Sequence, residues 1–185
     1  MKILHLAPFN TAGVPIEFVR AERKLGFYSR LVTLSRSRQG FEEDICLDLP
    51  LLDHWLIRLA KRIISPKSRM AVQYQAAIPK EIPRIWIPNQ LETSLIKFRE
   101  KLWESKIQRA IEKYNLFDFD IYQLDGGLGF FRDARIIRKL KCMGKRIICC
   151  YTGSDLRVRG VIPEIDKLSD LNIQSNLTIN FYTQI

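Results

Sequence analysis

The chain has 185 residues, of which 46% are hydrophobic and 27% are charged, and its formal net charge is +10. This composition excludes a largely disordered protein, and the length suits one domain with a sizeable core. Residues 51–115 hold 13 Lys and Arg against 6 Asp and Glu, a net of +7, so a local basic face is expected to attract phosphates or an anionic surface. Nucleic-acid binding is not expected, because aromatic and basic side chains are not interleaved as such a surface requires.

The four cysteines and two histidines show no metal-ligand spacing and no CxxC motif. Cys149 and Cys150 are adjacent in an apolar run, which is typical of small buried residues and not of a disulfide framework. We therefore expect no metal site and no cofactor. The first ten residues are too short for a signal peptide, and no later run approaches the length of a membrane span. A cytoplasmic protein is expected.

The first 35 residues predict a strand, a loop, a helix and a second strand. Residues 2–8 (KILHLAP) are apolar enough for a buried parallel strand, in which His5 is expected to be a core residue with one hydrogen bond. A loop of turn-forming residues precedes a helix over Ile16–Leu25, and residues 29–35 (SRLVTLS) follow as the second strand. Such a unit needs a right-handed crossover, so it implies a parallel sheet.

The middle third predicts two helices separated by an irregular segment. Residues 51–64 predict a basic helix with an apolar stripe, a composition typical of a membrane-surface helix that equally fits a helix packed on the sheet. The side chains expected to face a membrane are Trp55, Arg58, Lys61 and Arg62. Residues 65–90 contain four prolines and predict the irregular segment. Residues 91–114 predict a long charged helix with apolar positions at Leu95, Phe98, Leu102, Ile107 and Ile111.

Strands and helices alternate again after residue 115. Residues 120–125 (DIYQLD) predict a strand, residues 126–130 (GGLGF) a turn and Arg132–Cys142 a helix. Residues 145–152 (KRIICCYT) predict the next strand, and residues 171–175 (LNIQS) a short final one. The alternation predicts an α/β fold, with a Rossmann-like, mostly parallel sheet and helices on both of its faces.

Three loops follow predicted strands, at the edge where open parallel sheets bind their ligands. The candidate residues are Asn10, Thr11 and Gly13 in the first loop, Gly126 and Gly127 in the second, and Gly153, Ser154, Asp155 and Arg157 in the third. Glycine lets a backbone approach a ligand closely, Asp155 can accept hydrogen bonds from hydroxyl groups, and Arg157 can bind an anion. The alternatives are plain strand-to-helix turns for the first two loops and an Asp N-cap with solvated arginines for the third.

The chain lacks the common nucleotide-binding and hydrolase motifs. Neither GxGxxG nor GxxxxGK[ST] occurs, which argues against a dinucleotide-binding or nucleotide-hydrolysing site built on those motifs. No GxSxG or Cys/His pattern indicates a hydrolase.

Three stretches, in this order, resemble one enzyme family. Residues 1–35 resemble the start of the amino-terminal domain of GT-B-fold glycosyltransferases of the family-four-like group, where a KILH-type strand, a small Gly-containing loop and an xxLVRALRxLG-type helix precede an SxLVT-type strand. Residues 144–160 (GKRIICCYTGSDLRVRG) resemble a later strand of these proteins, which ends in a His-Gly-Ser-Asp-x-Arg type segment. Residues 165–175 (IDKLSDLNIQS) resemble the helix and strand that follow.

The resemblance implies one half of an enzyme in which two Rossmann-like domains face each other across a cleft. Residues 1–185 correspond to a single acceptor-side domain with a basic excursion at about 51–115, and the carboxyl-terminal domain that binds the nucleotide-sugar donor is expected to be absent. Gly13 and its neighbours then face the donor phosphates, while Gly153, Ser154 and Asp155 lie on the acceptor side. The implied reaction moves a sugar to a hydroxyl of a glycan or lipid-linked acceptor, with Asp155 as the candidate base if the enzyme inverts configuration.

Two departures from the family pattern bear on this expectation. Thr152 stands where the family often has His, so any role of that imidazole is absent or moved. The family's donor-binding Glu pair belongs to the absent half, and the similar spacing of Glu92 and Glu100 falls on the wrong element. The chain alone is therefore expected to be inactive, in the cytoplasm or peripheral on the inner face of the membrane. The alternative is a non-catalytic Rossmann- or flavodoxin-like module that binds a small anion or a protein partner.

Overall fold

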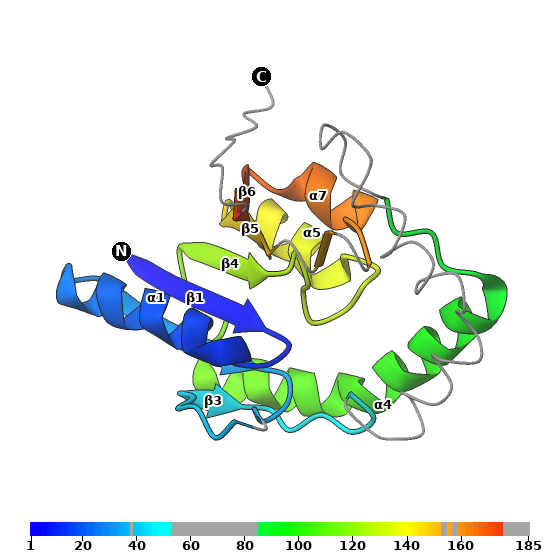
Figure 1. The fold of residues 1–185 in the computed structure, drawn as a ribbon, viewed down its shortest axis with the longest axis horizontal. Coiled ribbons are helices and arrows are strands. Elements are labelled where there is room, and N and C mark those ends of the chain that lie inside the picture. The colour runs from blue at the N-terminus through cyan, green and yellow to red at the C-terminus, as the bar shows by residue number, and fades with distance from the viewer. Residues whose placement is uncertain (38, 53–84, 153–154, 157–158, 176–185) are drawn as a thin grey trace.

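The computed structural model describes residues 1–37, 39–52, 85–152, 155–156 and 159–175. Within these ranges six strands form one sheet in the order β3-β2-β1-β4-β5-β6, and every pairing is parallel (Figure 1). The strands are β1 (Lys2–Ala7), β2 (Tyr28–Thr33), β3 (Ile45–Cys46), β4 (Ile121–Asp125), β5 (Arg146–Thr152) and β6 (Leu171–Ser175). The helices are η1 (Thr11–Gly13), α1 (Val14–Lys24), α4 (Gln90–Tyr114), α5 (Arg135–Cys142) and α7 (Pro163–Leu168). The predicted Rossmann-like α/β fold is confirmed.

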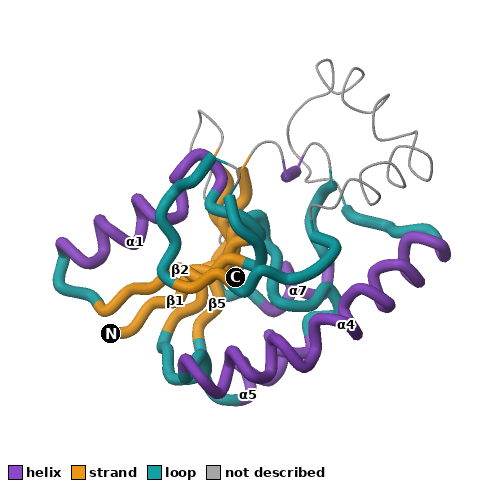
Figure 2. Tube along the Cα trace, turned by 90° about the horizontal axis from the view of Figure 1, so that it is seen from below, coloured by secondary structure: helices purple, strands orange, loops and turns teal. Residues whose placement is uncertain are grey.

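The helices cover both faces of the sheet, with α1 on one face and α4, α5 and α7 on the other (Figure 2). The pleat of β1 explains the division, because successive side chains of a strand point to opposite faces. Leu4 and Leu6 join the large core formed with the three later helices. Ala7 instead packs with Ile16 and Val19 of α1 in a smaller second core.

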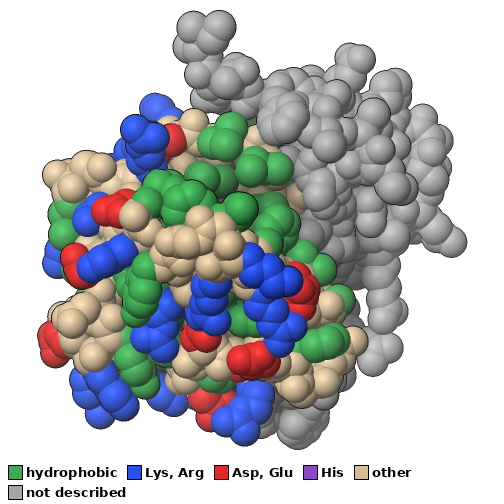
Figure 3. Space-filling view, turned by 90° about the vertical axis from the view of Figure 1, so that its left-hand side faces the viewer, with side chains coloured by type: hydrophobic (Ala, Val, Ile, Leu, Met, Phe, Trp, Pro, Cys, Tyr) green, Lys and Arg blue, Asp and Glu red, His purple; other side chains and the backbone are tan. Residues whose placement is uncertain are grey.

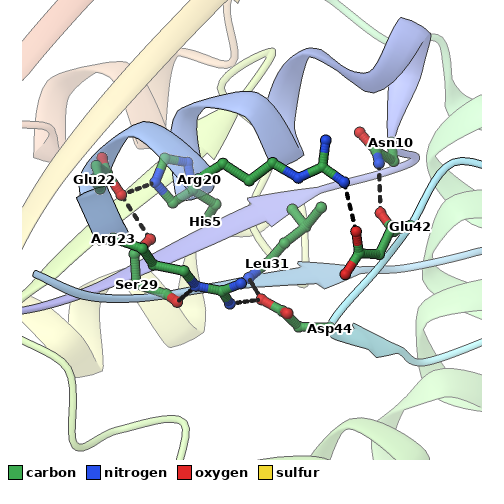
Figure 4. A network of polar contacts seen from close by, with 9 residues as sticks. All are labelled: His5, Asn10, Arg20, Glu22, Arg23, Ser29, Leu31, Glu42 and Asp44. Carbon is green, nitrogen blue, oxygen red and sulfur yellow. Dashed lines mark hydrogen bonds and ion pairs between the residues drawn. The ribbon is translucent and has the colours of Figure 1, made fainter. Parts of the chain in front are cut away.

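A network of polar side chains fixes α1 to the sheet (Figure 4). His5 of β1 is 2% exposed, and its Nε2 lies 2.7 Å from Oε2 of Glu22 on α1. The Ser29 hydroxyl donates to the same Glu22 oxygen over 2.6 Å. Burial alone would raise the pKa of Glu22, but the hydrogen bonds from His5 and Ser29 together lower it below its ordinary value. The prediction that His5 is a hydrogen-bonded core residue is confirmed.

Helix α4 is long, and only part of it packs on the sheet. It begins at an Asn89 cap, whose Oδ1 accepts a 2.8 Å hydrogen bond from the Glu92 backbone, and it ends at Asn115 in a left-handed conformation. Its buried row contains Arg99, Glu100, Trp103, Ile107, Ala110 and Ile111. Of the predicted apolar positions, two are buried, Ile107 and Ile111. The other three, Leu95, Phe98 and Leu102, are exposed.

Some predicted boundaries were wrong, each for a local reason. The two-residue strand β3, which pairs with Val32 and Thr33, was not predicted because two residues are too few to show a periodic pattern. Helix α5 begins at Arg135 and not at Arg132, because Ala134 adopts a left-handed conformation just before it. Residues 51 and 52 form a turn and a bend, so the predicted helix over 51–64 does not begin there.

The rest of that predicted helix lies outside the described residues. The side chains assigned to it, Trp55, Arg58, Lys61 and Arg62, therefore receive no structural test. In the part of the chain that the structure describes, no helix has the length and apolar character needed to cross a bilayer.

Candidate functional site

The loops that follow β1, β4 and β5 leave the same edge of the sheet, because all three strands are parallel. From the central pair β1 and β4, the chain continues to β2 on one side and to β5 on the other. The order of strands thus reverses between β1 and β4, and open α/β sheets bind their ligands at such a switch point. The described members of the predicted site lie in these loops.

The loop after β1 is held by buried polar contacts. Asn10 is fully buried, and its Nδ2 donates a 2.7 Å hydrogen bond to the carbonyl oxygen of Glu42, whereas its Oδ1 has no hydrogen-bond partner within the described residues. Gly13 has a φ of 71°, and a Cβ atom there would lie 3.1 Å from Cδ1 of Phe41. The Phe41 ring therefore occupies the space that the glycine opens, while Thr11 is exposed at the surface.

The loop after β4 uses its two glycines for close contact with other side chains. Both have positive φ angles, 63° at Gly126 and 64° at Gly127. A Cβ atom at Gly126 would lie 3.0 Å from Cγ of Asp155, and one at Gly127 would overlap the ring of Tyr151. The glycines therefore let the loop after β4 pack directly against β5 and the segment that follows it.

Two carboxyl groups share this edge of the sheet. Burial and, to a smaller extent, the nearby Asp155 carboxylate together raise the pKa of Asp125 to about 7, against the opposing effect of the Arg159 guanidinium. Burial, followed by the charges of Asp125 and Asp155, also raises the pKa of the Cys150 thiol to about 11. At neutral pH the Asp125 carboxyl is thus only partly ionised, and carboxyl groups with strongly shifted pKa values are frequent at functional sites.

Arg159 connects the loops after β4 and β5. Its Nη2 donates a hydrogen bond to the carbonyl oxygen of Gly126, and the carbonyl oxygen of Asp155 accepts hydrogen bonds from the backbone N–H groups of Arg159 and Gly160 at 3.0 and 2.9 Å. The alternative in which both arginines of this loop are solvated is therefore wrong for Arg159. The structure brings Asp155, Gly126 and Gly127 together as predicted.

Other predicted site residues lie elsewhere or cannot be placed. Asn10 and Gly13 belong to the neighbouring loop, where they contact Glu42 and Phe41. Gly153, Ser154 and Arg157 lie outside the described residues. No group of His, Cys, Asp and Glu side chains in the described ranges is arranged to hold a metal ion.

The sequence prediction missed Arg99 and Arg132, which lie near Arg159 at the same end of the sheet. Burial and the charges of Arg99 and Arg159 together lower the pKa of Arg132 to about 10, so its guanidinium is an electrostatic neighbour of both. One sequence signal was available for Arg99. It lies four residues before Trp103 and eight before Ile107, which places a charge on the buried row of α4.

The face of the molecule beside α1 shows no gathering of one charge. In Figure 3 basic and acidic side chains alternate over this face. Arg20 pairs with Glu17 and Glu42, both at 2.5 Å, and Arg23 pairs with Asp44 at 2.6 Å. The two Arg20 pairs are exposed, so each adds little stability, whereas the Asp44 side chain is only 13% exposed.

Comparisons with protein-family models, curated proteins and solved structures return no match for this chain. The functional argument therefore rests on the residues and the geometry given above.

Proposed function

We propose that the chain is the acceptor-side domain of a GT-B-type glycosyltransferase, which moves a sugar from a nucleotide-sugar donor to an acceptor hydroxyl. The observation that carries the proposal is the position of Asp155, whose carboxyl group lies against Gly126 at the carboxyl edge of β4 and β5. This edge adjoins the β1–β4 switch point of the sheet. The resemblance of about residues 1–35 and 116–175 to this family implies that Asp155 lies on the acceptor side or in the cleft.

The two carboxyl groups give the proposed site a route for the proton of the acceptor hydroxyl. In an inverting reaction, a base removes this proton as the hydroxyl oxygen attacks the anomeric carbon of the sugar. Asp155 is the proposed base. Asp125, whose pKa is raised by burial to about 7, can hold a proton at neutral pH and limits the charge that the pair accumulates.

The nucleotide-sugar donor is proposed to bind to a second Rossmann-like domain. That domain would complete the site across the cleft, so the 185-residue chain by itself is expected to give no turnover. Closure of the two domains would position the hydroxyl and exclude water, which together account for much of the rate enhancement in such reactions.

The decisive experiment measures transfer from UDP- and GDP-linked hexoses to glycan and lipid-linked acceptors by the full-length protein. We expect Asp155→Asn to lower kcat by about 100-fold or more, the range lost with a general base. Asp133→Asn is the matched control, because that carboxylate is exposed and pairs with Arg135. Full activity of Asp155→Asn would reject Asp155 as the base. No transfer with any donor would favour a non-catalytic module that binds a small anion or a protein partner.

We also propose that the protein binds peripherally to an anionic membrane surface, where a lipid-linked acceptor would be found. The support is an exposed apolar row on α4, formed by Leu91, Leu95, Phe98 and Leu102. These residues follow helical spacing along one side of the helix, and the exposed Arg109 continues the row. Apolar side chains beside basic ones suit the interface of an anionic bilayer, and the net charge of +10 would strengthen the attraction.

A further inference from the structure

Three arginines from distant parts of the sequence converge at the carboxyl end of the sheet. Arg99 comes from α4, Arg132 from the connection between β4 and α5, and Arg159 from the segment after β5. Arg132 is the central member: its backbone N–H donates to Glu100, the neighbour of Arg99, and its guanidinium stacks on Trp86, whose backbone N–H donates to Val161, two residues after Arg159. Three cations at short range repel one another, so the arrangement is favourable only with a compensating negative charge.

The three guanidinium groups are not fully paired. Arg99 is 7% exposed and its Nε has no hydrogen-bond partner, and Nη1 of Arg159 is likewise buried without one. A buried donor without an acceptor costs free energy, and a guanidinium costs more than a neutral group.

Nearby carboxyl groups balance only part of this charge. Oε1 of Glu100 accepts a 2.9 Å hydrogen bond from the backbone N–H of Arg132 and not from its guanidinium, and burial raises the pKa of Glu100. Asp125 has a pKa raised to about 7, so it is only partly ionised at neutral pH. Asp155 is close enough to Arg159 to oppose the lowering of its pKa by burial. Glu92 and Glu100 also oppose the lowering of the pKa of Arg132, so carboxyl groups around the cluster offset part of its positive charge but leave the N–H donors named above without acceptors.

Aromatic side chains hold two of the guanidinium groups in place. The Arg99 guanidinium carbon lies 4.3 Å from the ring centre of Trp103, and that of Arg132 lies 4.8 Å from the ring centre of Trp86. Trp86 is itself anchored, because its backbone N–H donates a 2.8 Å hydrogen bond to the carbonyl oxygen of Val161, two residues after Arg159. Stacking on a ring leaves the N–H edges of a guanidinium available for a ligand.

We propose that Arg99, Arg132 and Arg159 form a phosphate-binding site, and that the acceptor carries a phosphate or diphosphate group that binds there. The identification of the ligand as an acceptor rests on the proposed function, whereas the site itself does not. Guanidinium groups bind phosphate oxygens through paired, charge-assisted hydrogen bonds, and the unpaired N–H groups of Arg99 and Arg159 supply such donors. The site adjoins Gly126 and Asp155, so a bound phosphate would place the rest of an acceptor beside the proposed base.

The test is calorimetric titration of the 185-residue chain with inorganic pyrophosphate at low ionic strength. We expect saturable binding that Arg132→Gln and Arg159→Gln each weaken by about 10-fold or more, the loss of one charge-assisted pair. Arg138→Gln is the matched control, because that arginine is exposed and pairs with Glu164 on the surface of α5 and α7. Arg132→Lys keeps the positive charge but loses the paired N–H donors of the guanidinium, so its affinity is expected to lie between those of the wild type and Arg132→Gln. Urea unfolding of each variant verifies that it is folded.

Two results would overturn the site: no saturable binding, or an equal loss of affinity in Arg138→Gln, which would indicate non-specific attraction. Competition then identifies the source of the phosphate. Displacement of pyrophosphate by a hexose 1-phosphate at least as well as by UDP supports the acceptor, and much stronger displacement by UDP rejects it in favour of the donor. If the chain binds pyrophosphate through Arg132 and Arg159 but the full-length protein shows no transferase activity, the phosphate site stands and the proposed function is rejected.

Discussion

Gly127 lies so close to the ring of Tyr151 that no side chain fits between them. Tyr151 is 3% exposed, and its hydroxyl donates a 2.9 Å hydrogen bond to Asp166 of α7. The contact therefore packs the loop after β4 against β5, and the hydrogen bond to Asp166 connects β5 to α7. Since Gly126 in the same loop contacts Asp155 and Arg159, the position of the proposed site depends on this packing.

Replacing Gly127 by Ala is expected to destabilise the protein by at least about 2 kcal/mol more than replacing Gly144, because overpacking a buried ring adds to the backbone strain. Gly144→Ala is the matched control: its φ of 72° is similar to the 64° at Gly127, but nothing lies within 4 Å of its added Cβ. The free energy of unfolding in urea measures both. Equal losses of unfolding free energy in the two variants would show that the Tyr151 ring moves aside without a cost in free energy.

The raised pKa of Asp125 predicts a loss of stability as the pH rises. Its carboxyl titrates at about 7 in the folded protein, above its ordinary value of 3.8. Between those values the folded state binds more protons, so the free energy of unfolding falls with pH until about pH 7, by on the order of 4 kcal/mol. Asp125→Asn should remove this slope, and the exposed Asp133→Asn should keep it. Urea unfolding at about pH 5 and about pH 8 measures the difference. Parallel profiles for the wild type and Asp125→Asn would contradict the prediction.

The Glu22 network predicts the opposite pH dependence. Hydrogen bonds from His5 and Ser29 outweigh the effect of burial and lower the pKa of Glu22 below 4.5, so its contribution is present above that pH and is lost as the pH falls through the lowered pKa. Glu22→Gln is expected to cost about 1.5–3 kcal/mol near neutral pH and progressively less in acid. Glu17→Gln alters only an exposed ion pair with Arg20 and should cost about 0.5 kcal/mol or less. An acid-independent cost for Glu22→Gln would show that its charge is not involved.

The exposed row on α4 predicts binding to anionic vesicles. Phe98→Ser and Leu95→Ser should each weaken co-sedimentation with phosphatidylserine-containing vesicles several-fold, because each removes apolar surface from the interface. Leu25→Ser is the control, since Leu25 is even more exposed but follows α1, at a distance along the chain from the row. Raising the salt concentration should weaken the wild type. Equal binding to neutral and anionic vesicles at low salt would argue against the proposal.

The sheet was predictable from the sequence because its strands are short apolar runs separated by turn residues, as at residues 2–8 and 145–152. Because parallel strands end at one edge of the sheet, the three loops were also predicted to lie at the same edge. The contacts within the loops were not predictable. Gly13 and Gly127 suggested access for a ligand, and only the structure shows that Phe41 and Tyr151 fill those spaces.

The arginine cluster could not be assembled from the sequence, because its members are separated by 33 and 27 positions and meet only through the fold. The buried face of helix α4 was predicted only in part, for a different reason. Leu95, Phe98 and Leu102 give an apolar pattern as regular as that of a buried face, yet the buried row contains Arg99 and Glu100. Hydrophobic periodicity identifies the helix but does not distinguish a face packed in the core from an apolar face exposed at the surface.

The segment between Pro50 and Trp86 is held at both ends by hydrogen bonds to the folded domain. The Pro50 carbonyl oxygen accepts a 2.7 Å bond from the indole of Trp103, and the Trp86 N–H donates to Val161. Trp103 belongs to α4 and Val161 follows β5, so these two bonds tie residue 50 to the long helix and residue 86 to the segment that carries Arg159.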